Sequence, residues 1–114
     1  MIDFACKKLD IEEVIKCSLA LSKSDYKILK YLMENNSAHS TEKLASKVGL
    51  DKSTVQRSVK KLREKGLVSR GQINQSVGGY LFTYKIKEKE KIRKMITKII
   101  DSWVENVHFE IRNW

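Results

Sequence analysis

The feature that most constrains this fold is a pair of short helical patterns joined by a tight turn, within residues 40–71. In the first pattern, Leu44 and Val48 recur at helical spacing. We expect Thr41 to cap the N-terminus of this helix and Gly49 to end it. The sequence therefore predicts a short helix and a tight turn directly before a second helix.

The second helix is predicted over residues 52–65, after an N-terminal cap at Asp51. Val55, Val59 and Leu62 fall on one stripe, which we expect to be buried. Outside the stripe the side chains are mostly cationic or hydrogen-bonding, and such side chains bind base edges and phosphates. The DNA-binding residues expected in this motif are Thr41, Lys52, Ser53, Thr54, Gln56, Arg57, Lys60, Lys61 and Arg63.

The segment LDKSTVQRSVKKLREKGLVSR resembles the recognition helix and following strand of winged helix-turn-helix regulators of the MarR and TrmB-like kinds, with an archaeal source expected. The resemblance covers roughly residues 20–95. It implies that the second helix lies in the DNA major groove, where its polar residues from Lys52 to Arg57 face bases or nearby phosphates. A plain packed helix pair with a solvated basic face is the structural alternative, and helix-turn-helix units also occur in proteins that bind RNA or other proteins.

Two strand-like runs, residues 67–73 and 80–86, predict a hairpin that fits the wing of this family. Tyr80, Phe82 and Tyr84 alternate with other side chains, which predicts one face of the second strand on the core. The tip offers Asn, Gln and Ser where the family often carries arginine, so a passive hairpin is the alternative to minor-groove insertion. The wing residues expected to touch phosphates are Arg70, Gln72, Asn74 and Gln75.

Amphipathic patterns flank this motif. They predict a helix over about residues 10–20, a second helix from the capping-box pair Ser22 and Asp25 to about Asn35, and a long helix from Glu88 onward. The long helix is too apolar for a solvated tail, so we expect it to meet both the N-terminal helix and another subunit. Its expected dimer-interface residues are Ile92, Met95, Ile96, Ile99, Ile100, Trp103, Val107 and Ile111.

The expected fold is therefore mainly α with a small β-hairpin, a winged helix-turn-helix with additional terminal helices. It is a single domain over residues 1–114, with the winged helix core at 20–87 and the terminal dimerisation helices at 1–19 and 88–114. The resemblance implies dimerisation through these terminal helices. Two recognition helices would then lie about one turn of DNA apart, ~34 Å, on a roughly palindromic site.

The charge of the chain is segregated along the sequence. The net charge is +9, but residues 43–98 hold 16 Lys or Arg against 4 Asp or Glu, net +12, and the rest holds 7 against 10, net −3. This distribution is typical of an electrostatic footprint on phosphate. For the lysine-rich run at residues 85–94, an exposed helix start is the alternative.

Other chemistry is sparse in the sequence. Cys6 and Cys17 have no metal-ligand spacing and are expected to be buried or free thiols, with a redox role left open. His39 and His108 likewise lack companion ligands, so we expect no metal, no cofactor and no catalytic site. The 18 lysines, 11 isoleucines and absence of proline are compatible with a thermophile. With no apolar run near the ~20 residues of a membrane span and no signal-like N-terminus, we expect a cytoplasmic protein.

The leading functional hypothesis is a dimeric, sequence-specific DNA-binding transcriptional regulator. The first alternative is an architectural protein that coats double-stranded DNA with little sequence preference. The second is a protein-interaction module whose basic face binds an acidic partner, and an enzyme is the least expected class. Trp103, Phe109 and Trp114 are interpreted as interface anchors, with binding of a small effector near the dimer cleft as the alternative.

Overall fold

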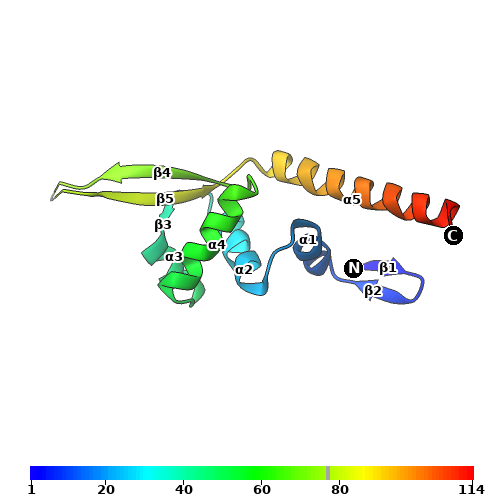
Figure 1. Ribbon diagram of the computed structural model, residues 1–114. Coiled ribbons are helices and arrows are strands. Elements are labelled where there is room, and N and C mark those ends of the chain that lie inside the picture. The colour runs from blue at the N-terminus through cyan, green and yellow to red at the C-terminus, as the bar shows by residue number, and fades with distance from the viewer. Residues whose placement is uncertain (77) are drawn as a thin grey trace.

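The computed structural model describes residues 1–76 and 78–114, and Val77, which belongs to the predicted hairpin tip, lies outside the described residues. Figure 1 shows the arrangement of the helices and strands in space. In chain order the elements are β1 (Ile2–Phe4), β2 (Lys7–Leu9), α1 (Ile11–Leu19), α2 (Lys23–Glu34), β3 (His39–Ser40), α3 (Thr41–Val48), α4 (Lys52–Glu64), β4 (Val68–Asn74), β5 (Tyr80–Ile86) and α5 (Lys89–Arg112).

The core lies where α2, α3 and α4 meet the base of the β4–β5 hairpin. The stripe predicted on α4 is confirmed, because Val55, Val59 and Leu62 are all buried. Ile28 of α2 and Leu44 of α3 are buried against the same cluster. This packing orients α4 with its opposite face outward, and the prediction of a mainly helical winged helix-turn-helix is confirmed.

Local capping explains where the helices begin. The capping box of Ser22 and Asp25 and the Asp51 cap of α4 are as predicted. The predicted Thr41 cap of α3 is wrong: the Ser40 side chain accepts a hydrogen bond from the Lys43 amide at 3.2 Å. Ser40 is the last residue of β3, whose pairing with β5 keeps the chain extended up to this position and makes it the cap.

The three-stranded sheet has the order β3-β5-β4, and both pairings are antiparallel. The expectation that one face of β5 packs on the core is confirmed at the base of the hairpin, where Phe82 and Ile86 pack against the core, but not in its outer half. Tyr84 is buried at the base, whereas Tyr80 is 58% exposed near the tip. The outer half of the hairpin instead projects beyond the helices as a wing (Figure 1).

The terminal segments differ from the predicted pair of helices. Helix α1 is present and packs against α5, as expected. Residues 2–9, however, form an antiparallel hairpin, β1–β2, that was not predicted from the sequence. Helix α5 extends away from the core, and Ile92 is the one buried residue among its members. The wing and α5 point in opposite directions, and the molecule measures 64 × 22 × 22 Å (Figure 1).

Candidate nucleic-acid interface

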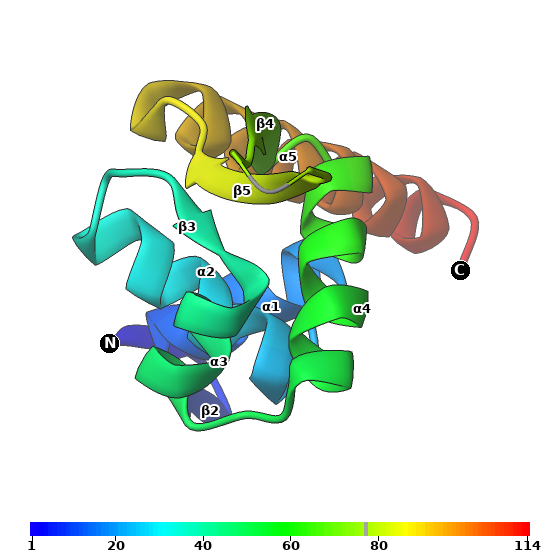
Figure 2. The same ribbon diagram turned by 90° about the vertical axis from the view of Figure 1, so that its left-hand side faces the viewer.

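The outer face of α4 carries a row of exposed polar side chains. Successive helix residues are ~100° apart, so Ser53, Arg57 and Lys60 project from the side opposite the buried valines. All three are exposed, as are Gln56 and Arg63 on the adjoining flank. Seen from the wing end, α4 stands at the edge of the molecule with its outer side uncovered (Figure 2). These five side chains provide cations and hydrogen-bonding groups on one accessible surface.

A chain of hydrogen bonds runs along the first turns of α4. The hydroxyls of Ser53 and Thr54 both donate to the Asp51 carboxylate, and Arg57 Nη2 donates to Thr54 Oγ1 at 3.4 Å. The Ser53 and Thr54 hydrogen bonds lower the pKa of Asp51 to about 2, so the cap is charged at neutral pH. The Asp51 carboxylate thus fixes Thr54, and Thr54 in turn positions the guanidinium of Arg57 at the outer face.

Lys52 lies at the N-terminal end of the same helix. Its Nζ atom is 3.2 Å from Glu42 Oε1 of α3, and both side chains are more than half exposed. An ion pair this exposed contributes ~1 kcal/mol or less, so a phosphate could replace Glu42 as the partner of Lys52 at little cost. Thr41 is half-buried in the first turn of α3.

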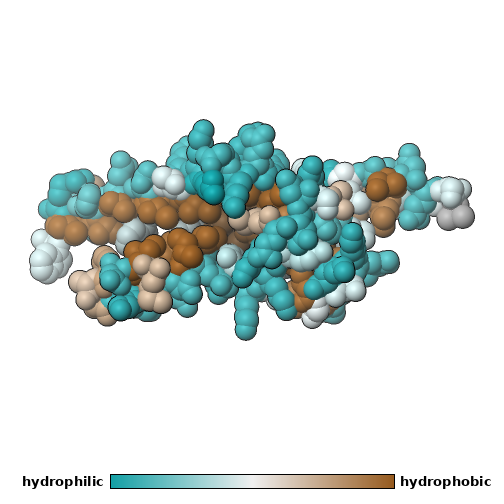
Figure 3. Space-filling model, turned by 180° about the vertical axis from the view of Figure 1, so that it is seen from behind, coloured by the Kyte–Doolittle hydropathy of each residue, from teal (hydrophilic) through white to brown (hydrophobic). Residues whose placement is uncertain are grey.

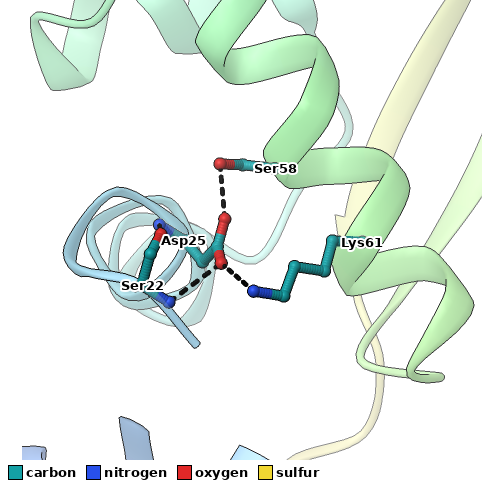
Figure 4. A network of polar contacts seen from close by, with 4 residues as sticks. All are labelled: Ser22, Asp25, Ser58 and Lys61. Atoms are coloured by element: carbon teal, nitrogen blue, oxygen red, sulfur yellow. Dashed lines mark hydrogen bonds and ion pairs between the residues drawn. The ribbon is translucent and has the colours of Figure 1, made fainter. Parts of the chain in front are cut away.

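Lys61 differs from the other cations predicted to contact DNA. Its Nζ atom lies 2.8 Å from Oδ2 of Asp25, a carboxylate whose residue is only 4% exposed (Figure 4). Ser58 donates to Oδ1 of the same carboxylate at 2.6 Å, and the Ser22 amide donates to Oδ2 at 2.9 Å. Lys61 was predicted from the sequence as a DNA contact, and the structure pairs it with Asp25, a non-local carboxylate that the sequence does not identify.

This network ties α4 to the start of α2. Burial raises the pKa of Asp25, but the hydrogen bonds from Lys61, Ser58 and Ser22 outweigh it and bring the pKa to about 2. Asp25 is consequently a charged, buried group with hydrogen bonds to both oxygens. Removal of its charge would leave Lys61 without this partner and weaken the contact that sets the position of α4 on α2.

The wing presents its polar residues on one face. The strand register places Arg70, Gln72 and Asn74 on the same side of the hairpin, opposite Tyr84, Phe82 and Tyr80 respectively. The Arg70 guanidinium lies over the Phe82 ring at 4.1 Å, and the Tyr80 and Phe82 ring centroids are 4.9 Å apart. The predicted phosphate-binding residues thus share a face with two aromatic rings. Gln75 is exposed at the tip, where its backbone N–H donates to the carbonyl of Gly79.

Sequence reasoning missed three members of this site. Asp25 was predicted only as a helix cap, and Ser58 had no assigned role although it lies one turn before Lys61 on α4. Phe82, assigned to the core, packs against the edge of the core and also lies under the Arg70 guanidinium. The one usable signal was the i, i+3 spacing of Ser58 and Lys61, which places both side chains on the flank of α4 that faces α2.

The side chains of residues 1–76 and 78–114 also bear on metal binding and membrane insertion. Within this part of the chain, no group of three or more His, Cys, Asp or Glu residues is placed to hold a metal ion. The same residues include no helix with the length and apolar character needed to cross a membrane.

The fold and sequence can be compared with known proteins. A family model described as winged helix-turn-helix DNA-binding matches residues 21–69. The solved structure of a possible transcriptional regulator from Methanosarcina mazei Go1 is 45% identical in sequence to this chain and has a TM-score of 0.94. The match covers 100% of this chain and 96% of the Methanosarcina chain. An uncharacterized protein of Methanocaldococcus jannaschii is 31% identical to this chain, and the match covers 89% of this chain and 82% of the Methanocaldococcus protein. A MarR protein from Peptoclostridium difficile shares the fold alone, because it is only 19% identical in sequence and has a TM-score of 0.58. That match covers 91% of this chain and 65% of the MarR chain.

Proposed function

The chain belongs to the winged helix-turn-helix DNA-binding family of transcriptional regulators, and we propose that it binds a roughly palindromic DNA site as a homodimer with α4 in the major groove. The observation that carries this proposal is the outer face of α4. Ser53, Gln56, Arg57 and Lys60 are all exposed there, while the buried stripe holds the helix from behind. Glutamine and arginine at such positions read adenine and guanine edges, respectively.

The roles divide between the two ends of α4. Arg57 is the base-reading residue that we propose, because the hydrogen bond to Thr54 holds its guanidinium at the outer face before DNA arrives. Lys60 and Arg63 lie further along the helix, where cations meet the phosphate backbone and set the register. We do not propose Lys61 as a DNA contact, because its ammonium group is paired with the Asp25 carboxylate.

The wing is proposed to contact the backbone through its strand residues. Arg70 stacks on Phe82, which limits the conformations of the guanidinium, and Gln72 and Asn74 extend the same face toward the tip. These side chains can reach phosphates without an arginine at the tip. Specificity would therefore depend mainly on α4, and the wing would add affinity.

Dimerisation is proposed to occur through α5. Its apolar stripe is covered near Ile92 but exposed further along, with Trp103 60% and Ile111 61% exposed. Large apolar side chains left open in a row are typical of an interface. A dimer joined at this end would present two α4 helices to DNA from one side.

Selection of bound fragments from a random duplex pool tests this function. We expect a shared motif with two-fold symmetry and half-sites about one DNA turn apart. The control is the Arg57→Ala variant, for which we expect the preference at one position of each half-site to relax. A pool that shows no shared motif would contradict sequence-specific regulation and favour the architectural alternative, in which the protein coats DNA.

A further inference from the structure

The N-terminal hairpin β1–β2 has a face with three apolar side chains, of which one, Leu9, is half-buried and the other two are exposed. The register pairs Ile2 with Leu9 and Phe4 with Lys7, so Ile2, Phe4 and Leu9 lie on one side of the hairpin. Phe4 is 65% exposed, and Ile2 is also exposed. A two-stranded hairpin is marginally stable in water unless one face packs against another element. Its presence therefore calls for a partner surface.

A matching surface lies on α5. The stripe containing Ile99, Trp103 and Ile111 is exposed, and Trp103, Val107, Ile111 and Trp114 line a shallow hollow toward the C-terminal end. Seen from behind, apolar side chains form one band along α5 and another over the N-terminal segment beneath it (Figure 3). Each chain thus carries both an apolar hairpin face and an apolar helix stripe.

The stripe alone is small for a stable dimer. Residues 99–112 span ~21 Å of helix, and a helix is ~10 Å across, so the stripe is a narrow strip. A stable interface buries roughly 800 Å² on each partner. The hairpin face and the neighbouring exposed Ile11 are the apolar surfaces adjoining α1 and α5 that can enlarge the contact.

The short connection between the hairpin and α1 disfavours packing of the hairpin on α5 of the same chain. Asp10 is the single residue between β2 and α1, and its carboxylate caps α1 by accepting from the Glu12 amide at 3.1 Å. Helix α1 packs against α5, so this short connection fixes the direction of the hairpin, and Phe4 and Trp103 both stay open within one chain. In a two-fold dimer, each hairpin can cover the partner's stripe.

We propose that β1–β2 is a dimerisation arm whose Ile2–Phe4–Leu9 face packs on the Trp103–Trp114 hollow of a second copy of this chain. The charges agree with this occupant, because Lys7, which shares the hairpin face with Phe4, would approach Glu110 at the edge of the partner's hollow. The inference rests on the proposed homodimer and adds which segment completes it.

Intersubunit cross-linking tests the arm directly. One full-length chain carries Cys17→Ser and keeps Cys6, which is exposed in the hairpin turn. A second, differently tagged chain carries Cys6→Ser, Cys17→Ser and Glu110→Cys, with the new thiol at the edge of the hollow. After mixing, we expect a short bifunctional maleimide to join the two chains. A partner chain with Phe109→Cys in place of Glu110→Cys is the control, because Phe109 lies off the stripe, and we expect little cross-linking there.

The outcomes separate the arm from the dimer. A protein that sediments as a dimer but gives no cross-link between the two chains would overturn the arm and leave the proposed function intact. A monomer would overturn both.

A second variant avoids any dependence on thiol reactivity. Phe4→Asp should raise the dimer dissociation constant ~10-fold or more, because an exposed phenylalanine that is buried on association contributes about that much. Lys8→Ala, on the opposite face of the hairpin, should have a smaller effect. Since Phe4 is largely exposed, its replacement should leave the monomer folded, and an unchanged dissociation constant would contradict the arm.

Discussion

At the scale of single residues, two carboxylates hold helix α4 in position. Asp51 caps α4 and fixes Thr54 and, through it, Arg57. Asp25 holds the same helix from the other side through Ser58 and Lys61. The caps could be predicted from sequence, because a cap depends on neighbours in the chain. The Lys61 contact could not, because its partner lies 36 residues away and only the folded chain brings them together.

The Asp25→Asn variant tests the buried network. The pKa of Asp25 is about 2 in the folded protein against 3.8, so its stabilising effect is complete above pH ~4 and is lost as the pH falls toward 2. We expect the variant to lose about 1–2 kcal/mol of unfolding free energy at pH 7 and to show a weaker pH dependence between pH 4 and 2. Urea unfolding of both proteins at several pH values measures this.

The comparison has a built-in control. Asp51 also has a pKa lowered to about 2, but it is present in both proteins, so the difference between them isolates Asp25. An identical pH dependence in the two proteins would show that the carboxylate does not stabilise the fold through its charge.

Arg57→Ala tests the proposed base reader. We expect a loss of ~1–3 kcal/mol in binding to the selected DNA site and a clearly smaller loss on random duplex. The matched control is Lys30→Ala, because Lys30 is an exposed cation on α2 outside the proposed interface. Binding titrations on both DNAs provide the comparison. Equal losses on the two DNAs would mean that Arg57 meets only the backbone.

At the scale of elements, long periodic segments were predictable and short paired ones were not. The amphipathic repeats of α2, α4 and α5 define those helices, and Gly49 marks the turn between α3 and α4. Strand β3 has only two residues and forms through pairing with β5, a contact that no local pattern encodes. The three-residue strands β1 and β2 are equally short. The wing was predicted as a hairpin, but how far it projects depends on where the core ends.

Gly49→Ala tests the turn of the helix-turn-helix. Gly49 has φ +69° and its amide closes α3 on the Ala45 carbonyl, while no atom lies within 4 Å of an added Cβ. The cost should therefore come from the left-handed backbone alone, about 1–2 kcal/mol of unfolding free energy. Ser46→Ala, at an exposed position of α3, should change the stability by less than half as much. Thermal unfolding of the two variants would decide, and equal stabilities would argue against strain at this turn.

At the scale of the whole molecule, the chain is more extended than one compact domain. Its radius of gyration is 17.2 Å, against ~13 Å expected for a compact chain of this length. The excess comes from the wing at one end and α5 at the other (Figure 1). From the sequence, the segregation of charge predicted a DNA-binding surface, and the apolar C-terminal pattern predicted a dimer interface. The sequence could not show that the two surfaces lie at opposite ends.

Trp103→Lys tests the role of α5. Trp103 lies on the exposed stripe, and we expect the variant to be monomeric at concentrations where the native chain is a dimer, because a buried, unpaired ammonium is costly. Phe109→Lys is the matched control, since Phe109 is exposed to a similar extent but lies off the stripe. Sedimentation equilibrium measures both. A dimer that survives Trp103→Lys would place the subunit contact elsewhere.

The central claim is that this chain reads DNA sequence through α4, and titration of one protein against two duplexes over a range of salt concentrations tests it most directly. The duplexes are the selected site and a scrambled version of equal length. With Lys60, Arg63 and Arg70 on phosphates in each subunit, log K should fall with log [salt] at a slope of about −5 on the selected site. At every salt concentration the selected site should bind at least ~10³-fold more tightly than the scrambled duplex. A flat salt dependence, or equal affinity for both duplexes, would contradict the claim.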